Sequence, residues 1–290
     1  MVAVLGMMPA ARIAHGQADQ WKDRAEYDLV QALNGAADPN KKLELLNQWK
    51  TKYPESNFKM ARVKLILQTY QQMGKAQEML DTAKEIVSLD AKDIAGPYWI
   101  TLLTMSMGKT DAGTLTQGEK AANTLIGMLD TPPPGVAADA WAKQKPGMEF
   151  EARKTIAWIQ TNRKDWPAVE RDAAKLLELK PGFSQASFWI ASAELAQKKY
   201  DPAFWNFART AAYDGPDAMP EANRKQTGDY LKRIYNQYHG DASGLDDILA
   251  KARPIRRSLK NSMWKASPKR LSARATSSRK RIRNSTCGST

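Results

Sequence analysis

The chain has 290 residues, of which 42% are hydrophobic and 26% are charged, so it holds enough apolar side chains to build a folded core. Its single cysteine, Cys287, and its two histidines, His15 and His239, exclude an intrachain disulfide framework and argue against a Cys/His zinc site. Of the 44 Lys and Arg residues, 13 lie at positions 251–290, which leaves 31 to balance the 31 Asp and Glu residues, all of which precede position 251. The net charge of +13 therefore describes the end of the chain and not its fold.

Residues 1–20 begin with an apolar run, residues 1–11, and pass through small residues to a polar segment that starts at Trp21. This order is typical of the second half of a secretory signal peptide, here without the basic segment that normally precedes the apolar run. The run is too short for a transmembrane helix. We therefore expect an exported or periplasmic protein. The alternative is a cytoplasmic protein with a frayed, mildly apolar N-terminus.

From residue 21 to about residue 252, apolar side chains recur three and four positions apart in stretches of about 12 to 16 residues. This spacing predicts a series of amphipathic helices. The stretches are separated by turn-forming residues such as Asn34-Gly35 and Tyr53-Pro54. Few segments alternate with period two, so we predict an all-α fold without a sheet.

Similar residues return after 34 positions at the same helical phase. The triplet Met-Gly-Lys at 73–75 recurs at 107–109, and the pair Ile-Ala at 156–157 recurs at 190–191. A helix–turn–helix unit of this length buries too little apolar surface alone and must stack on its neighbours. The period thus predicts an array of antiparallel helix pairs, with Ala157 and Ala191 small where two helices approach closely.

This pattern resembles the tetratricopeptide repeat, in which W-x2-L-G-x2-Y is followed by A-x3-F and P. Ile66 and Tyr70 match the first part in one unit, and Ala203 and Phe207 match the second part in another. The chain is also similar to bacterial exported tetratricopeptide proteins of undefined activity. The resemblance implies a superhelical α-solenoid over residues 21–252. Its units are expected at about 23–56, 60–93, 94–130, 150–183, 184–216 and 225–252.

A proline-rich insertion, residues 131–147, separates the third expected unit from the fourth. Its three consecutive prolines favour an extended, stiff segment over a helix. The insertion either hinges two half-arrays or packs Trp141 against the convex side of the array.

No arrangement of residues suggests catalysis, so we predict no catalytic residue, no metal site and no cofactor. The sequence Gly108-Lys109-Thr110 ends like a phosphate-binding loop, but Leu103 stands where that motif needs a glycine. It is therefore interpreted as a turn between helices. His239, directly before Gly240, is expected to end a helix.

The first helix of each unit lines a concave groove in tetratricopeptide proteins, and the resemblance implies the same here. On the expected groove face, aromatic side chains mix with uncharged hydrogen-bonding groups, as suits a peptide ligand. The alternative is that these side chains pack on the next unit. The predicted partner-binding residues are Lys64, Gln68, Gln71, Gln72, Tyr98, Leu102, Lys154, Trp158, Asn162, Phe188 and Ser192. Of these, Tyr98, Trp158 and Phe188 are expected to be partly exposed.

The basic tail, residues 253–290, has too few apolar residues to fold alone. It is either a solvated disordered tail, a frameshift-derived sequence or an arm that binds nucleic acid or an anionic surface. We predict a non-enzymatic scaffold that binds an unidentified peptide or protein segment in its groove. The alternative is association with nucleic acid or an anionic surface, weak and acting through the tail.

Overall fold

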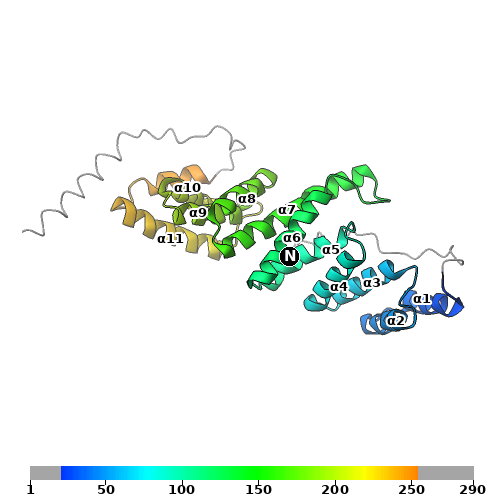
Figure 1. The fold of residues 1–290 in the computed structure, drawn as a ribbon. Helices are drawn as coiled ribbons and strands as arrows, with labels where there is room; N and C mark the ends of the chain where they lie inside the picture. Colours follow the sequence, from blue (N-terminus) through cyan, green and yellow to red (C-terminus); the bar gives the residue numbers. More distant parts are fainter. Residues whose placement is uncertain (1–20, 254–290) are drawn as a thin grey trace, which may run out of the picture. The chain divides into compact units, whose positions relative to one another are not determined.

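The computed structural model describes residues 21–253, which form twelve α-helices and contain no strand. The chain divides into two units, Met1–Arg253 and Pro254–Thr290, and all the helices belong to the first. The expected signal segment and the basic tail lie outside the described residues. The helices are α1 (Arg24–Gly35), α2 (Pro39–Lys52), α3 (Lys59–Gln72), α4 (Ala76–Leu89), α5 (Ala95–Met107), α6 (Ala112–Met128), α7 (Ala138–Arg163), α8 (Trp166–Leu179), α9 (Ser184–Ala196), α10 (Tyr200–Ala212), α11 (Glu221–His239) and α12 (Leu245–Ala252) (Figure 1).

Short polar residues and glycines set the ends of these helices. An aspartate precedes α1, α2, α6 and α8, and in each case its carboxylate accepts a hydrogen bond from a backbone N–H in the first turn. Gly108 ends α5 with φ of 64°, so the Gly-Lys-Thr sequence is a turn between helices, as predicted. His239 is the last residue of α11, and Gly240 follows with φ of 90°, a left-handed conformation that suits glycine. Both predictions about these turns are confirmed.

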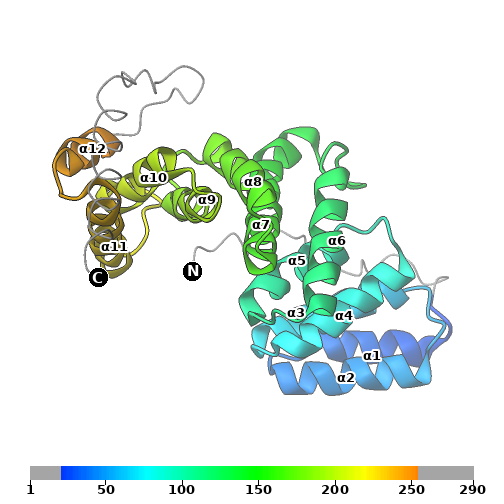
Figure 2. The same ribbon diagram turned by 60° about the vertical axis from the view of Figure 1, so that its left-hand side comes forward.

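The helices pack on their neighbours in chain order, as Figures 1 and 2 show. Four hydrophobic clusters follow the same order: the first joins α1 to α3, the second α3 to α7, the third α7 to α9 and the fourth α9 to α12. Ala157 and Ala191 are fully buried, as expected for positions where helices approach closely. The predicted all-α array of antiparallel helix pairs is confirmed.

Polar contacts recur between successive helix pairs. In each contact, a side chain near the turn between the two helices of one pair bonds to a side chain on the second helix of the preceding pair. The three contacts are Lys109 to Gln77, Arg163 to Glu119 and Lys199 to Glu170. Exposed contacts of this kind contribute little stability each. They recur at three successive junctions because the helix pairs stack in a similar way at each.

The insertion agrees with its prediction only in part. Its three consecutive prolines, residues 132–134, lie outside the helices, as predicted, but α7 begins at Ala138 and continues for 26 residues through Pro146, so residues 138–147 are helical rather than extended. Pro146 removes one backbone hydrogen bond, and the burial of apolar side chains on either side of it offsets this cost. Trp141 is 4% exposed, and its indole N–H donates to the carbonyl of Leu129 at 3.0 Å. Trp141 belongs to the hydrophobic cluster that joins α3 to α7. Of the two alternatives, the structure therefore supports the packing of Trp141 and not the hinge.

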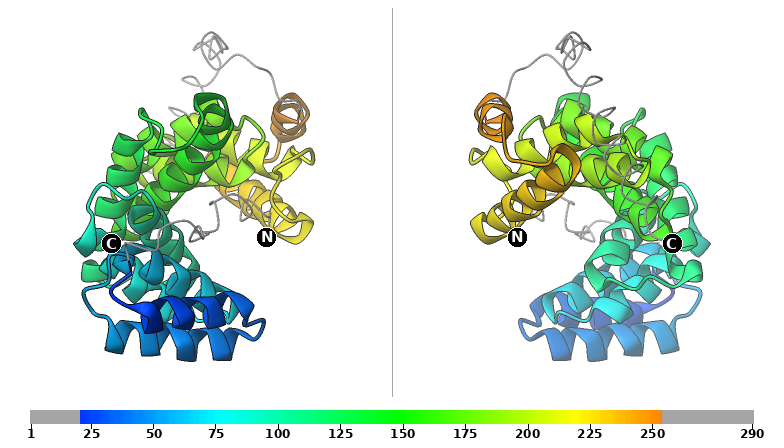
Figure 3. Two further views of the ribbon diagram at one scale, coloured as in Figure 1. Left: turned by 90° about the vertical axis from the view of Figure 1, so that its right-hand side faces the viewer. Right: turned by 90° about the vertical axis from the view of Figure 1, so that its left-hand side faces the viewer.

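The last expected unit also differs. Helix α11 begins at Glu221 rather than at residue 225, and α12 packs on α10 instead of forming a regular hairpin with α11. Leu245 and Ala252 of α12 are buried in the same cluster as Phe204 of α10. The short α12, drawn in orange in Figure 3, therefore covers the end of this cluster.

Candidate functional site

A groove of about 680 Å³ lies between α9 and α11, the first helices of the last two units. Its lining combines apolar side chains with uncharged polar ones and contains no charged residue. The lining residues are Gln185, Phe188, Ser192, Leu195 and Ala196 of α9, Phe207 of α10, Met219 from the turn before α11, and Asn223, Gln226, Thr227 and Tyr230 of α11.

Three aromatic rings form a row along this groove. The centroids of Phe188 and Phe207 are 5.8 Å apart, and those of Phe207 and Tyr230 are 5.3 Å apart. Both pairs meet at 73°, the edge-to-face geometry that aromatic rings favour. Phe207 is buried, whereas Phe188 and Tyr230 are half-buried. The row offers a ligand an apolar surface whose rings already hold one another in place.

The polar groups of the groove divide into satisfied hydroxyls and unpaired amides. Ser192 Oγ donates to the carbonyl of Phe188, and Thr227 Oγ1 donates to the carbonyl of Asn223, each at 2.8 Å. Within residues 21–253, the side-chain amides of Gln185, Asn223 and Gln226 form no hydrogen bond with the protein. Each of these amides offers donors and an acceptor to a ligand.

The two walls of the groove are tied together at one end. Ser184, the first residue of α9, accepts a hydrogen bond at its Oγ from the backbone N–H of Met219 at 2.7 Å. Its own N–H donates to the carbonyl of Asp217 at 3.3 Å. Arg224 Nε donates to the carbonyl of Met219 at 3.1 Å. The turn before α11 is thereby fixed to the start of α9, so the groove exists before any ligand binds.

The structure brings together only part of the predicted site. Phe188 and Ser192 line the groove between α9 and α11. Trp158 is half-buried and packs against the cluster that joins α7 to α9. Asn162, one turn later, is exposed, and its amide donates to the carbonyl of Trp158 at 2.8 Å. Trp158 and Asn162 are not part of the groove.

The prediction that Tyr98 is partly exposed was wrong. Tyr98 is 6% exposed and lies in the cluster that joins α3 to α7, with its ring centroid 5.5 Å from that of Trp99. Residues 95–101 of α5 are all buried because α4, α6 and α7 pack around this helix. Burial also raises the pKa of the Tyr98 hydroxyl. Leu102 is half-buried against the same cluster.

The remaining predicted residues lie on α3 and α7, away from the groove. Lys64 forms an ion pair with Asp93, and Lys154 forms one with Glu151 at 2.5 Å. Gln71 is half-buried, and the other two predicted glutamines of α3, Gln68 and Gln72, are exposed.

Sequence reasoning missed the wall of the groove that α11 supplies. Asn223, Thr227 and Tyr230 follow one another four and three positions apart, a spacing that places them on one face of a helix. That signal was present in the sequence. The expected start of the sixth unit at residue 225 left Asn223 outside that unit, whereas α11 begins at Glu221.

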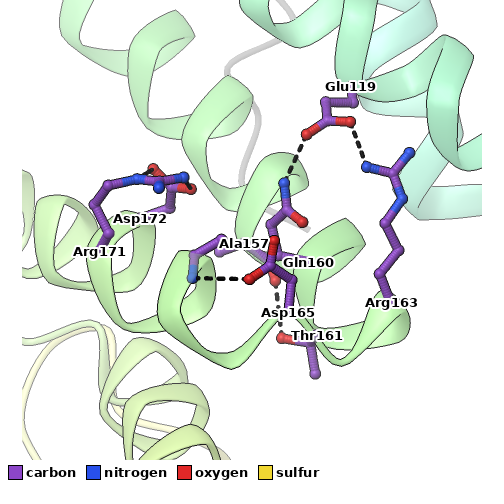
Figure 4. A network of polar contacts seen from close by, with 9 residues as sticks. Glu119, Ala157, Gln160, Thr161, Arg163, Asp165, Arg171 and Asp172 are labelled. Atoms are coloured by element: carbon purple, nitrogen blue, oxygen red, sulfur yellow. Dashed lines mark hydrogen bonds and ion pairs between the residues drawn. The ribbon is translucent and has the colours of Figure 1, made fainter.

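A second, more polar pocket of about 370 Å³ lies among α6, α7 and α8. In Figure 4, Gln160 donates to Glu119 at 2.6 Å, and Arg163 pairs with the same carboxylate. Arg171 pairs with Asp172 at 2.8 Å. The contacts of Gln160 and Arg163 with Glu119 join α7 to α6, whereas the Arg171–Asp172 pair lies within α8, so each contact has a structural role.

Glu194 of α9 occupies the position that Gln160 holds 34 residues earlier. It is 9% exposed, and Asn206 Nδ2 donates to its carboxylate at 2.9 Å. Burial raises the pKa of Glu194 to about 7, and the nearby Glu170 adds to this effect. A carboxyl group with such a pKa is typical of active sites. Glu194, however, lines neither of the two pockets described here.

The described part of the chain contains neither a cluster of metal-ligating side chains nor a membrane-spanning helix. Residues 21–253 contain no group of three or more His, Cys, Asp or Glu side chains placed to hold a metal ion. None of the helices in that range combines the length and the apolar character needed to cross a bilayer.

The helix pairs, their 34-residue period and their packing in chain order define a tetratricopeptide-like α-solenoid. No family model matches the chain, and no curated protein matches it. The fold is similar to a tetratricopeptide repeat protein from Parabacteroides merdae, at 14% identity and a TM-score of 0.37, over 79% of this chain and 99% of that one. It is also similar to a thermophilic tetratricopeptide protein from Thermus thermophilus, at 11% identity and a TM-score of 0.31, over 73% of this chain and 97% of that one.

Proposed function

We propose that this protein is a non-enzymatic scaffold that binds a segment of a partner polypeptide in the groove between α9 and α11. The observation that carries the proposal is a preformed groove in which a row of three rings adjoins three side-chain amides without protein partners. Concave sites that combine apolar surface with a few fixed polar groups are typical binding sites.

The chemistry of the groove suits an extended polypeptide. The amides of Gln185, Asn223 and Gln226 match the alternating N–H and C=O groups of a peptide backbone. An apolar side chain of the ligand has a surface to bury against at the rings of Phe188 and Tyr230. Polypeptide segments supply both features together.

The hydroxyls of the groove do not suit nucleophilic catalysis. Ser192 and Thr227 both donate their protons to backbone carbonyls of their own helices. The groove lining includes neither a histidine nor a carboxylate that could act as a base for either hydroxyl. These observations favour binding over chemistry at this site.

The test uses the full chain and a displayed library of random peptides of about nine residues. Peptides selected on the protein are then measured by fluorescence anisotropy against two variants. Ala196→Trp places a large side chain in the groove from an exposed position, and Ala174→Trp does the same on α8, outside the groove. We expect Ala196→Trp to weaken binding by about tenfold or more and Ala174→Trp to leave it within about twofold. Equal binding by both variants would contradict the proposal.

A further inference from the structure

We propose that the polar pocket among α6, α7 and α8 is a second binding site, which takes a small molecule that carries one carboxylate on a short apolar body. The volume of the pocket, about 370 Å³, lies near the lower end of the range for small-molecule sites. The pocket shares no helix with the groove between α9 and α11. The inference therefore does not depend on the proposed function.

Both carboxylates in the lining of this pocket already have cationic partners. Glu119 accepts a hydrogen bond from Gln160 at 2.6 Å and pairs with Arg163. Asp172 is 6% exposed and accepts from Nε and Nη2 of Arg171, at 3.3 and 2.8 Å. A cationic ligand would have to displace one of these arginines, so the pocket does not suit a cation.

Three other side chains of the lining offer N–H donors that are not used in this way. Lys175 of α8 is half-buried and forms no ion pair within residues 21–253. Arg153 of α7 contacts a single oxygen of Glu149 through Nε at 2.9 Å and Nη2 at 2.7 Å, and its Nη1 has no partner among the described residues. The exposed amide of Asn123 on α6 forms no hydrogen bond in that part of the chain either. These donors match the oxygens of an anionic group.

The unused donors lie towards one end of the pocket. Asn123 on α6 and Lys175 on α8 come four and three residues after the paired carboxylates of their helices. Arg153 on α7 comes seven residues before Gln160, which corresponds to about 10 Å along the helix. Because α7 runs antiparallel to α6 and α8, all three side chains are displaced in the same direction. The pocket thus has one end where acids and bases are paired and another where donors are available.

The charges of the lining favour a ligand with a single negative charge. The lining holds three cations and two anions, namely Arg153, Arg171 and Lys175, and Glu119 and Asp172. Their partners outside the lining, Glu149 and Arg163, cancel each other. Asp165, which also acts on Arg171, caps α8, where its charge meets the positive end of the helix. One carboxylate balances the charge of Lys175, whereas a doubly charged phosphate would leave an excess of negative charge in a partly buried site.

Two isoleucines line the same end of the pocket. Ile156, which is 6% exposed, follows Arg153 by three residues, and the half-buried Ile126 follows Asn123 by three. This spacing places each isoleucine on the same helix face as the donor before it. A short hydrocarbon chain attached to the carboxylate can bury apolar surface against them. An inorganic anion has no such group.

The ligand class is tested on the full chain by saturation-transfer difference NMR in a phosphate-free buffer. Butyrate is the probe, and butyramide is its uncharged counterpart of nearly the same shape. We expect saturable binding of butyrate and about tenfold or more weaker binding of butyramide, because hydrogen bonds to a charged group are the stronger ones. Inorganic phosphate at the same concentration should leave most of the butyrate signal in place, since it cannot use the isoleucines.

Substitutions assign the binding to this pocket. Lys175→Gln removes a charge without breaking an ion pair and should weaken butyrate binding by about tenfold, whereas Lys175→Arg should stay within about threefold. Asn123→Ala, at an exposed position, should weaken it by about threefold. Lys42→Gln is the matched control, expected within about twofold, because Lys42 of α2 is also half-buried and without an ion pair in the described helices. An unchanged midpoint of urea unfolding shows that each variant is folded.

Four results would overturn the inference. The first two are equal binding of butyrate and butyramide, and unchanged butyrate binding by both Lys175→Gln and Asn123→Ala. The third is the absence of saturable butyrate binding up to about 50 mM. The fourth is full displacement of butyrate by an equal concentration of phosphate, which would show a site for anions without an apolar body. None of these results depends on peptide binding in the groove, so the proposed function is tested separately by Ala196→Trp.

Discussion

Replacing Glu194 with Gln is expected to stabilise the protein above about pH 7 and to change its stability little near pH 5. Glu194 is 9% exposed, and its carboxylate accepts a hydrogen bond from Asn206 of α10 at 2.9 Å. Its pKa is raised from 4.5 to about 7, mainly by burial and further by Glu170, while Asn206 and Lys199 lower it. The folded state therefore binds this proton more tightly than the unfolded state does.

The sign follows from that difference. Below the unfolded pKa of 4.5 the group is protonated in both states, and its contribution to stability is fully present. As the pH rises towards 7 and above, ionisation favours the unfolded chain and the contribution is lost. At about 1.4 kcal/mol per pH unit, the gap between 4.5 and about 7 corresponds to a loss of about 3 kcal/mol. Gln has nearly the same shape and does not ionise, so Glu194→Gln removes this loss.

Urea unfolding followed by far-UV circular dichroism, at about pH 5 and about pH 8.5, measures the effect. The difference in free energy of unfolding between Glu194→Gln and the unmodified protein should grow by about 2–3 kcal/mol from the lower pH to the higher. Glu178→Gln, at an exposed position on α8, is the matched control and should show no such growth. A constant difference for Glu194→Gln across this pH range would refute the reasoning.

Four other outcomes are expected. Ala191 is fully buried, so Ala191→Leu should overpack its cluster and lower the free energy of unfolding in urea by about 1–3 kcal/mol; a change within about 0.3 kcal/mol would show that the repeat phase is wrong. Trp158→Ala should cost about 1–3 kcal/mol because the ring packs on the cluster that joins α7 to α9, yet leave the binding of groove-selected peptides within about twofold. Deleting residues 254–290 should abolish any weak DNA binding seen in filter assays at about 50 mM salt, and salt-resistant binding by the shortened chain would contradict this. Export stays a prediction that fractionation of the source cells would test through the recovery of the protein outside the cytoplasm.

The architecture could be predicted because equivalent residues of a structural repeat recur in the sequence at the length of that repeat. Ala157 and Ala191 recur 34 positions apart, and both are fully buried. The errors arose where the chain departs from that period. The insertion was expected to be extended up to residue 147, but α7 begins at Ala138 and continues through Pro146, with Trp141 and Phe150 buried on either side of it. Tyr98 was predicted to be exposed from its position in the helical repeat alone. The packing of α4, α6 and α7 around α5 instead buries all sides of the first turns of α5.

One of the two walls of the groove could be predicted for the same reason. Phe188 and Ser192 lie on α9, which keeps the repeat phase, so their face could be assigned from the sequence. The opposite wall could not be assigned in this way, because α11 follows an irregular turn and α12 packs on α10. The groove depends on both α9 and α11, and only α9 keeps the repeat phase from which its exposed face could be predicted.

The length of α7 has a consequence for how the array unfolds. This helix contributes Ile156 to the cluster that joins α3 to α7, and Phe150 and Ala157 to the cluster that joins α7 to α9. In a repeat array the coupling between neighbouring units sets how far an opening spreads. Because one continuous helix belongs to two clusters, the loss of either cluster removes packing from the other. Amides in α4 and α8, on either side of α7, should therefore exchange with solvent through the same cooperative opening.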